Sequence, residues 1–210
     1  MKFFKKICCA ILAPPMNRPL FLTLCAIIFL GFGCGPKPSS DSTSEMPVID
    51  RAAILFEAKQ NGLIMTDEEK IKMADPSRLK TVQDSSPTDT ATYAKKDFSG
   101  WKSAALADVT GGESFGLAFS RYTKGQYTIV GQLGNLPEPQ TGYVYEGWLI
   151  RRGENMSVVH VGVAHAVESG HGLVFLSNED LSDHDFFVLT LEPDDLNSNP
   201  AEHILEGTLN

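Results

Sequence analysis

The clearest feature of the chain is an alternation of side chains over residues 142–151. Tyr143 and Tyr145 fall on one face of an extended backbone, and Glu146 and Trp148 fall on the other, as alternate residues of a strand do. Aromatic and β-branched residues, which strands favour, fill much of the stretch, and turn signals lie on both sides of it. Because apolar runs also precede and follow it, we expect this strand in the middle of a sheet.

A similar strand-like pattern continues from Phe98 to the end of the chain. Short apolar runs alternate with turn signals, and no long helical pattern separates them. This spacing predicts that residues 98–210 form an all-β domain, an antiparallel β-sandwich of about seven strands. The expected strands are residues 114–122, 126–133, 142–151, 158–167, 172–176, 185–191 and 204–209.

Residues 49–80 have a helical pattern instead. Apolar residues first recur at helical spacing, and Thr66 and Glu69 then have the spacing of a capping box. The second short helix that this box begins is expected to end before Pro76. We interpret the segment as a packing appendage or semi-ordered stalk, and a partner-binding helical hairpin is the alternative. Residues 81–97 have the composition of a linker.

The first 33 residues are predicted to be a targeting segment. Residues 20–33 are apolar and uncharged, shorter than the roughly 20 residues that a membrane-spanning helix needs, with Arg18 on their flank. They lead into Cys34 through small residues, as in a bacterial lipobox, where the cysteine is acylated and becomes the new N-terminus. We therefore expect residues 1–33 to be a lipoprotein signal peptide, with Met16 as an alternative start. An uncleaved anchor with an incidental cysteine is the other interpretation.

Residues 34–48 are rich in Pro, Ser and Gly, and too few of them are apolar to offset the entropy lost on ordering. They are expected to be a tether between a lipid on Cys34 and the folded part. The expected location is extracytoplasmic, with the protein lipid-anchored to a bacterial membrane. The expected partners are that membrane and another envelope protein.

Charge and cysteine content exclude two classes of chemistry. Four of the 18 Lys and Arg residues, and none of the 26 Asp and Glu residues, precede Cys34, so the rest of the chain is strongly acidic. An acidic domain repels phosphate backbones, and we expect no nucleic-acid partner. All 4 cysteines lie at or before Cys34. The folded part therefore has no disulfide, thiolate metal ligand or cysteine nucleophile.

The sequence contains no catalytic constellation that we recognise. It has no Ser-His-Asp order and no Gly-rich phosphate loop, so we expect neither enzyme activity nor a cofactor. His165, His171 and His184 are candidates for a metal site, because imidazole suits zinc and copper. Their spacing specifies no ligand set, and surface or packed histidines are the alternative. Glu192 and Pro193 are expected to end a strand, with the Glu192 carboxylate accepting hydrogen bonds from backbone donors.

Trp148 is expected to be buried in the interior of the sandwich. It lies in the strand that we place centrally, and a sandwich buries one face of each strand. An exposed aromatic binding face that Trp148 shares with the tyrosines of its strand is the alternative. The expected neighbours of Trp148 are Leu133, Phe187 and Leu189.

Four segments follow one another along the chain: a Leu-Pro turn, a Tyr-x-x-Trp-Leu strand, a Thr-x-Glu-Pro segment and a closing apolar strand. In this order they resemble the C-terminal, extracytoplasmic domain of anti-sigma-K-type factors. The resemblance covers residues 115–209 and implies a β-sandwich presented outside the membrane. The four segments are residues 133–137, 142–150, 188–193 and 204–209.

The resemblance does not imply sigma-factor binding. Members of that family carry an intracellular zinc-binding or helical domain before a transmembrane helix, and the residues before Leu20 contain no His-x-x-x-Cys-x-x-Cys pattern. We therefore expect a non-catalytic, membrane-anchored lipoprotein that exposes a sensing or binding β-sandwich in the cell envelope. The alternatives are a regulatory anti-sigma-like sensor that acts through a separate membrane partner, and a small extracytoplasmic metal-binding protein.

Overall fold

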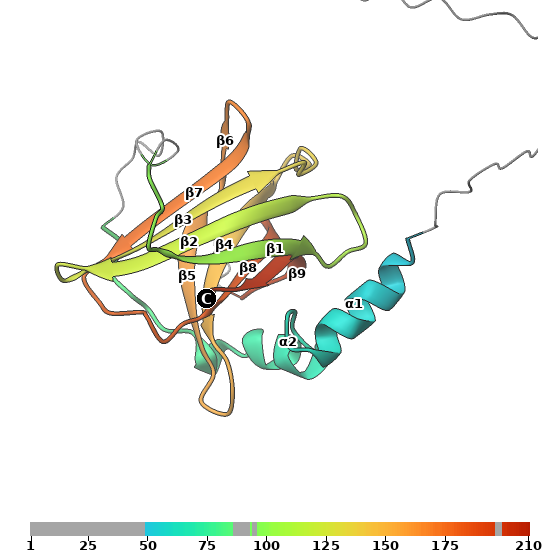
Figure 1. Ribbon diagram of the computed structural model, residues 1–210, viewed down its shortest axis with the longest axis horizontal. Helices are drawn as coiled ribbons and strands as arrows, with labels where there is room; N and C mark the ends of the chain where they lie inside the picture. The colour runs from blue at the N-terminus through green and yellow to red at the C-terminus, as the bar shows by residue number, and fades with distance from the viewer. Residues whose placement is uncertain (1–48, 86–92, 94–95, 196–198) are drawn as a thin grey trace, which may run out of the picture. The chain divides into compact units, whose positions relative to one another are not determined.

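The computed structural model describes residues 49–85, 93, 96–195 and 199–210 (Figure 1). The expected signal peptide, Cys34 and the tether up to residue 48 lie outside the described residues. From Pro47 to Asn210 the chain forms one compact unit. The helical segment belongs to the same unit as the strands and packs against them; the expected boundary at residue 98 stays a prediction.

Two short helices and a single 3₁₀ turn precede the strands. They are α1 (Arg51–Gln60), α2 (Asp67–Met73) and η1 (Pro76–Arg78). The Asp50 side chain caps α1 by accepting a hydrogen bond from the backbone N of Ala53. At α2 the expected capping box is formed, because Thr66 and Glu69 each accept a hydrogen bond from the backbone N of the other.

The described residues contain nine strands, all in one antiparallel sheet, so the prediction of an all-β fold is confirmed. The sheet order is β5-β4-β8-β9-β1-β2-β3-β7-β6, where the sequence predicted about seven strands in a sandwich. The strands are β1 (Lys102–Asp108), β2 (Phe115–Thr123), β3 (Gln126–Gly134), β4 (Tyr143–Arg151), β5 (Ser157–Val163), β6 (His165–Val167), β7 (Gly170–Ser177), β8 (Phe186–Pro193) and β9 (Glu202–Thr208).

The strand count differs from the expectation for two local reasons. Strand β1 was not anticipated, and the run predicted over residues 158–167 is divided into β5 and β6. Gly162, at a φ of 101°, bends the backbone there, and the Ala164 backbone N donates to the Tyr145 carbonyl at 2.8 Å. Because β5 pairs with β4 and β6 pairs with β7, this bent segment joins the two ends of the sheet order.

The sheet curves until its two halves face each other across one interior core, as Figure 1 shows. The packing is tight: a Cβ on Gly147 of β4 would lie 2.5 Å from the Leu173 side chain of β7. The core takes side chains from both halves, among them Leu106, Ala118, Tyr127, Ile129, Leu133, Leu149, Phe175, Phe187, Leu189 and Leu205.

The segment after η1 bridges the remaining gap between β5 and β7. Lys80 N donates to the Val158 carbonyl of β5, and Ser85 N donates to the Leu176 carbonyl of β7, both at 2.8 Å. Between these two anchor points, Val82 packs against the interior core. This part of the expected linker is therefore an integral part of the sheet's closure.

A second apolar cluster lies on the outer face of β4, β5 and β8, beneath the helical segment. Trp148 is fully buried in it, and its indole Nε1 donates to Thr190 Oγ1 at 2.7 Å. The expected neighbours Leu133, Phe187 and Leu189 belong to the interior core instead, because alternation turns Trp148 away from the face of Leu149. The cluster contains Met65, Met73, Trp148, Ile150, Met156, Val158, Phe186 and Val188.

A buried ionic network ties the helical segment to the sheet at Glu206 of β9. The fully buried Glu206 carboxylate accepts a hydrogen bond from Met65 N, contacts His203 Nδ1 at 2.8 Å and pairs with Lys70 Nζ at 3.2 Å. Burial raises the pKa of Glu206, but the hydrogen bonds from His203 and Met65, with the charges of His203 and Lys70, outweigh it. The pKa of Glu206 therefore lies below its ordinary value.

We predict that Met73→Ala destabilises the protein by about 2–5 kcal/mol, because it empties a buried site between α2 and the sheet. The matched control is Ile71→Ala, two residues earlier in the same helix, whose side chain is exposed. Its expected effect is within about 0.5 kcal/mol. Denaturant unfolding of both variants measures the difference. Equal midpoints for the two variants would show that the helical segment contributes nothing to the core.

We predict that Glu206→Gln costs about 3–5 kcal/mol near neutral pH, because it removes the charge that compensates buried partners. Since the folded-state pKa of Glu206 is lowered, its contribution is fully present above the unfolded-state pKa and is lost as pH falls through the folded-state value. The stability difference from the parent should shrink in acid. Glu202→Gln, at an exposed position of the same strand, is the control. A difference that stays constant into acid contradicts this assignment.

Candidate functional site

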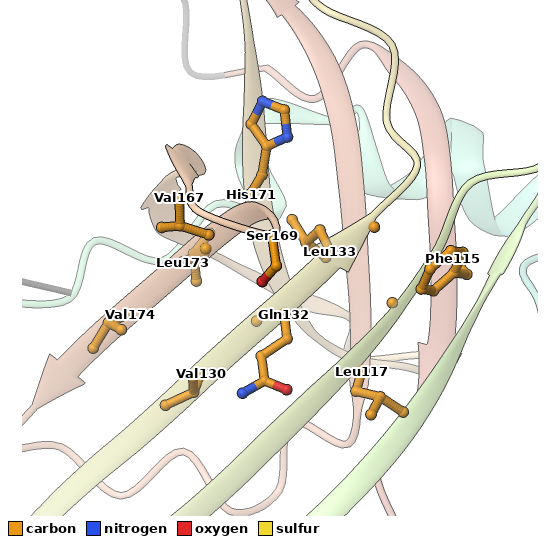
Figure 2. Close-up of a pocket in the computed structure, with 14 residues that line it drawn as sticks. Phe115, Leu117, Val130, Gln132, Leu133, Val167, Ser169, His171, Leu173 and Val174 are labelled. Carbon is orange, nitrogen blue, oxygen red and sulfur yellow. The ribbon is translucent and has the colours of Figure 1, made fainter. Parts of the chain in front are cut away.

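A groove of about 320 Å³ crosses the outer face of β2, β3 and β7, away from the strands that the helical segment covers (Figure 2). Cross-strand pairing places its side chains next to one another: Leu117 pairs with Gln132, and Val130 pairs with Val174. Hairpin β6–β7 contributes the opposite wall. The outward-facing side chains that line the groove are Phe115, Leu117, Val130, Gln132, Val167, Ser169 and Val174.

The groove is apolar and open to solvent. Phe115 is 61% exposed, Leu117 is 44% exposed, and Val167 is exposed on the opposite wall. Gln132, which Figure 2 shows on the floor between Val130 and Leu117, supplies an amide that can donate and accept hydrogen bonds. Exposed apolar surface of this kind, with few polar groups, is typical of binding sites.

Two glycines leave space for the groove by lacking a side chain. A Cβ on Gly134 would lie 2.5 Å from the Phe115 ring, so only glycine lets the ring lie across β3. A Cβ on Gly172 would lie 3.3 Å from Val167 Cγ1 and would narrow the space between β7 and β6. The depth of the groove therefore depends on backbone positions that carry no side chain.

The groove contains no acid–base pair among the described residues. His171 is its one ionisable lining residue, and its ring points away from Gln132 and Ser169 in Figure 2. The His171 ring lies edge-on to Tyr145, 5.6 Å between centroids, and its Nδ1 is buried without a hydrogen-bond partner in the described chain. This lining suits the binding of an apolar group.

A second cavity, of about 740 Å³, opens at the end of the sheet between the β1–β2 and β3–β4 connections. The Tyr145 hydroxyl donates a hydrogen bond to the Pro137 carbonyl at 3.0 Å. Burial raises the pKa of Tyr145, and the nearby carboxylates of Glu138 and Asp108 raise it further. Asp108 has a structural role there, since it accepts hydrogen bonds from three backbone N–H groups of its own loop. Burial raises the pKa of Asp108, but the hydrogen bond from the Thr110 hydroxyl and these backbone bonds outweigh it and lower the pKa overall.

The three histidines proposed as metal ligands are not brought together. His165 pairs with Gly172 and His171 pairs with Ala166, so the two imidazoles project from opposite faces of the hairpin. His184 is buried elsewhere: its Nδ1 lies 2.7 Å from Asp183 Oδ1, and its Nε2 lies 3.2 Å from Ser157 Oγ. Burial lowers the pKa of His184. Within the described ranges, no group of three or more His, Cys, Asp or Glu side chains is placed to hold a metal ion.

Glu192 and Pro193 lie at the end of β8. The Glu192 carboxylate is buried and accepts a hydrogen bond from Ala201 N at 2.7 Å. Burial raises the pKa of Glu192, and the nearby Glu146 adds to the rise. The carboxylate therefore holds the β8–β9 connection and faces neither cavity.

Sequence reasoning missed the groove, although one signal for it was present. Strand β2 is apolar at Phe115, Leu117 and Phe119, and small at the alternate positions Gly116 and Ala118. Large residues on one face and small residues on the other indicate that the interior is crowded and that the large residues face outward. The contribution of Val167 had no comparable signal, because it depends on how hairpin β6–β7 folds over β3.

No helix in the described part of the chain is long and apolar enough to cross a membrane. Comparisons with protein-family models, with curated proteins and with solved structures each found no match. The resemblance to anti-sigma-K-type factors therefore rests on the four sequence segments and stays a prediction.

Proposed function

We propose that this protein is a non-catalytic lipoprotein, anchored to a bacterial membrane, whose β-domain binds an apolar segment of another envelope protein. The observation that carries the proposal is the exposed apolar groove over β2, β3 and β7. Two of its side chains, Phe115 and Leu117, are the most exposed large apolar side chains on the described strands, at 61% and 44%. Leaving such side chains in water costs free energy that a bound partner recovers.

The chemistry of the groove favours binding over catalysis. Its lining has one amide and one hydroxyl, at Gln132 and Ser169, and both suit hydrogen bonds to a peptide backbone. The buried ionic groups lie elsewhere and have structural partners, as Glu206 and Glu192 do. The facing halves of the curved sheet would be the two layers of the sandwich that the family resemblance implies.

The membrane anchor in this proposal is a lipid on Cys34, which follows the apolar residues 20–33. Residues 34–48 would then tether the folded unit to the membrane surface. Such a tether keeps the groove close to other envelope proteins without a membrane-spanning segment in the folded unit.

Site-specific photo-crosslinking in intact envelopes tests the groove. A photoreactive residue at Leu117 should give a discrete crosslinked species, while one at Tyr122, exposed on the same strand outside the groove lining, should not. Gln132→Arg, which places a charge on the groove floor, should remove the crosslink at Leu117. Gln126→Arg, at the other end of β3, should leave it. If both probe positions crosslink alike, or Gln132→Arg has no effect, the groove is not the binding site.

Cell fractionation of Cys34→Ser tests the anchor. The expected result is release from the membrane fraction, because acyl chains contribute about 0.8 kcal/mol per buried methylene to membrane affinity. The mass of the parent protein should show the lipid. A parent without lipid, together with a variant that stays in the membrane, would identify residues 20–33 as an uncleaved anchor instead.

A further inference from the structure

Exposed apolar side chains are concentrated in the helical segment as well as in the groove. Of the ten large apolar side chains exposed in the described chain, five lie in residues 49–71, a small part of its length. They are between 55% and 74% exposed, more than most of those on the sheet. The five are Ile49, Ile54, Phe56, Leu63 and Ile71.

Helix α1 contributes nothing to either core. None of its ten residues is buried in the structure as described, although the helix carries Ile54, Leu55 and Phe56 in succession. Its side-chain links to the rest of the unit are polar: Arg51 donates to the Gly112 carbonyl and pairs with Glu113 at 3.1 Å, and Lys59 pairs with Asp67. A helix of this length is marginal in water without packing. Its apolar side chains therefore gain burial only against something outside the folded unit.

The position of this segment in the chain indicates what that surface is. Ile49 follows Cys34 by 15 residues, and 14 residues, 35–48, separate the lipid attachment point from it. A chain of that length reaches at most about 50 Å when extended and averages about 20 Å when flexible. A tether this short gives the segment a high effective concentration at the membrane surface, so that even a weak contact is populated.

The charges of the segment favour apolar contact over electrostatic attraction. Three of its cations are neutralised within the protein: Arg51 by Glu113, Lys59 by Asp67 at 2.8 Å, and Lys70 by Glu206. Residues 49–73 contain four cations and five acids, so the segment is not attracted to anionic lipids. A neutral, zwitterionic lipid interface fits this combination of exposed apolar side chains and paired charges.

We infer that residues 49–71 form a second membrane contact, in which α1 and its flanking apolar side chains lie in the lipid interface beside the anchor. The inference rests on the proposed function, because the tether argument requires a lipid on Cys34. It adds an orientation: the helical segment faces the lipid, and the groove-bearing strands remain available to an envelope partner.

Lipid quenching of an introduced tryptophan tests the contact. The acylated full-length protein, carrying Trp101→Phe, is reconstituted into phosphatidylcholine vesicles with or without brominated acyl chains. Phe56→Trp adds a probe on α1, and Tyr122→Trp adds a matched probe at an exposed position of β2. Trp148 is fully buried and gives a constant background. The expected result is blue-shifted emission from position 56, with a loss of intensity in brominated vesicles that added salt does not reverse, and no loss at position 122.

Each other outcome overturns the inference in a distinguishable way. If Cys34 is acylated and the protein is vesicle-bound, but position 56 emits as in water, the second contact is wrong and the lipoprotein proposal stands. If position 56 is blue-shifted but insensitive to brominated lipid, the segment is buried against protein, a second copy or another partner. If the mass shows no lipid on Cys34 and the protein does not float with vesicles, the proposed function fails and the inference fails with it.

Discussion

The packing of Met65 and Met73 in the apolar cluster that contains Trp148 is the interaction on which the rest of this structure depends. Strands β4, β5 and β8 carry large apolar side chains on both faces, so a single sheet with one wet face would leave one set in water. The helical segment covers that second set, and the buried Glu206 network fixes its position through Met65 and Lys70. The segment is thus part of the core, although it precedes the strands and is separated from them in sequence.

This cover makes the two halves of the sheet unequal. The helical segment covers the outer face of β4, β5 and β8. The outer face of β2, β3 and β7 carries an apolar groove in which Phe115 and Leu117 are exposed. The residues after η1 bridge the two halves. Lys80 N donates to the Val158 carbonyl on the covered half, and Ser85 N donates to the Leu176 carbonyl on the groove-bearing half. The fold therefore leaves one apolar surface exposed while it buries another.

The ionisable groups follow the same division of roles. Those that are buried, such as Glu192, Glu206 and His184, hold connections between elements and have hydrogen-bond partners. The groove has almost none. In the proposed binding role the groove would recognise an apolar surface by shape and burial, while the buried charges serve stability.

The sequence by itself determined the all-β fold class, the capping box at Thr66 and the burial of Trp148, because alternation, cap spacing and residue size are local properties. It could not decide which face of β4 is interior. Alternation says which residues share a face, but both faces of β4 are apolar, and only the position of the helical segment made Trp148 an outer-face residue. The groove, the separation of His165 from His171, and the closure by residues 79–85 likewise depend on which strands the fold makes neighbours. That choice belongs to the tertiary structure, because pairing between distant strands is set by the burial of both faces of the whole sheet and not by any one segment.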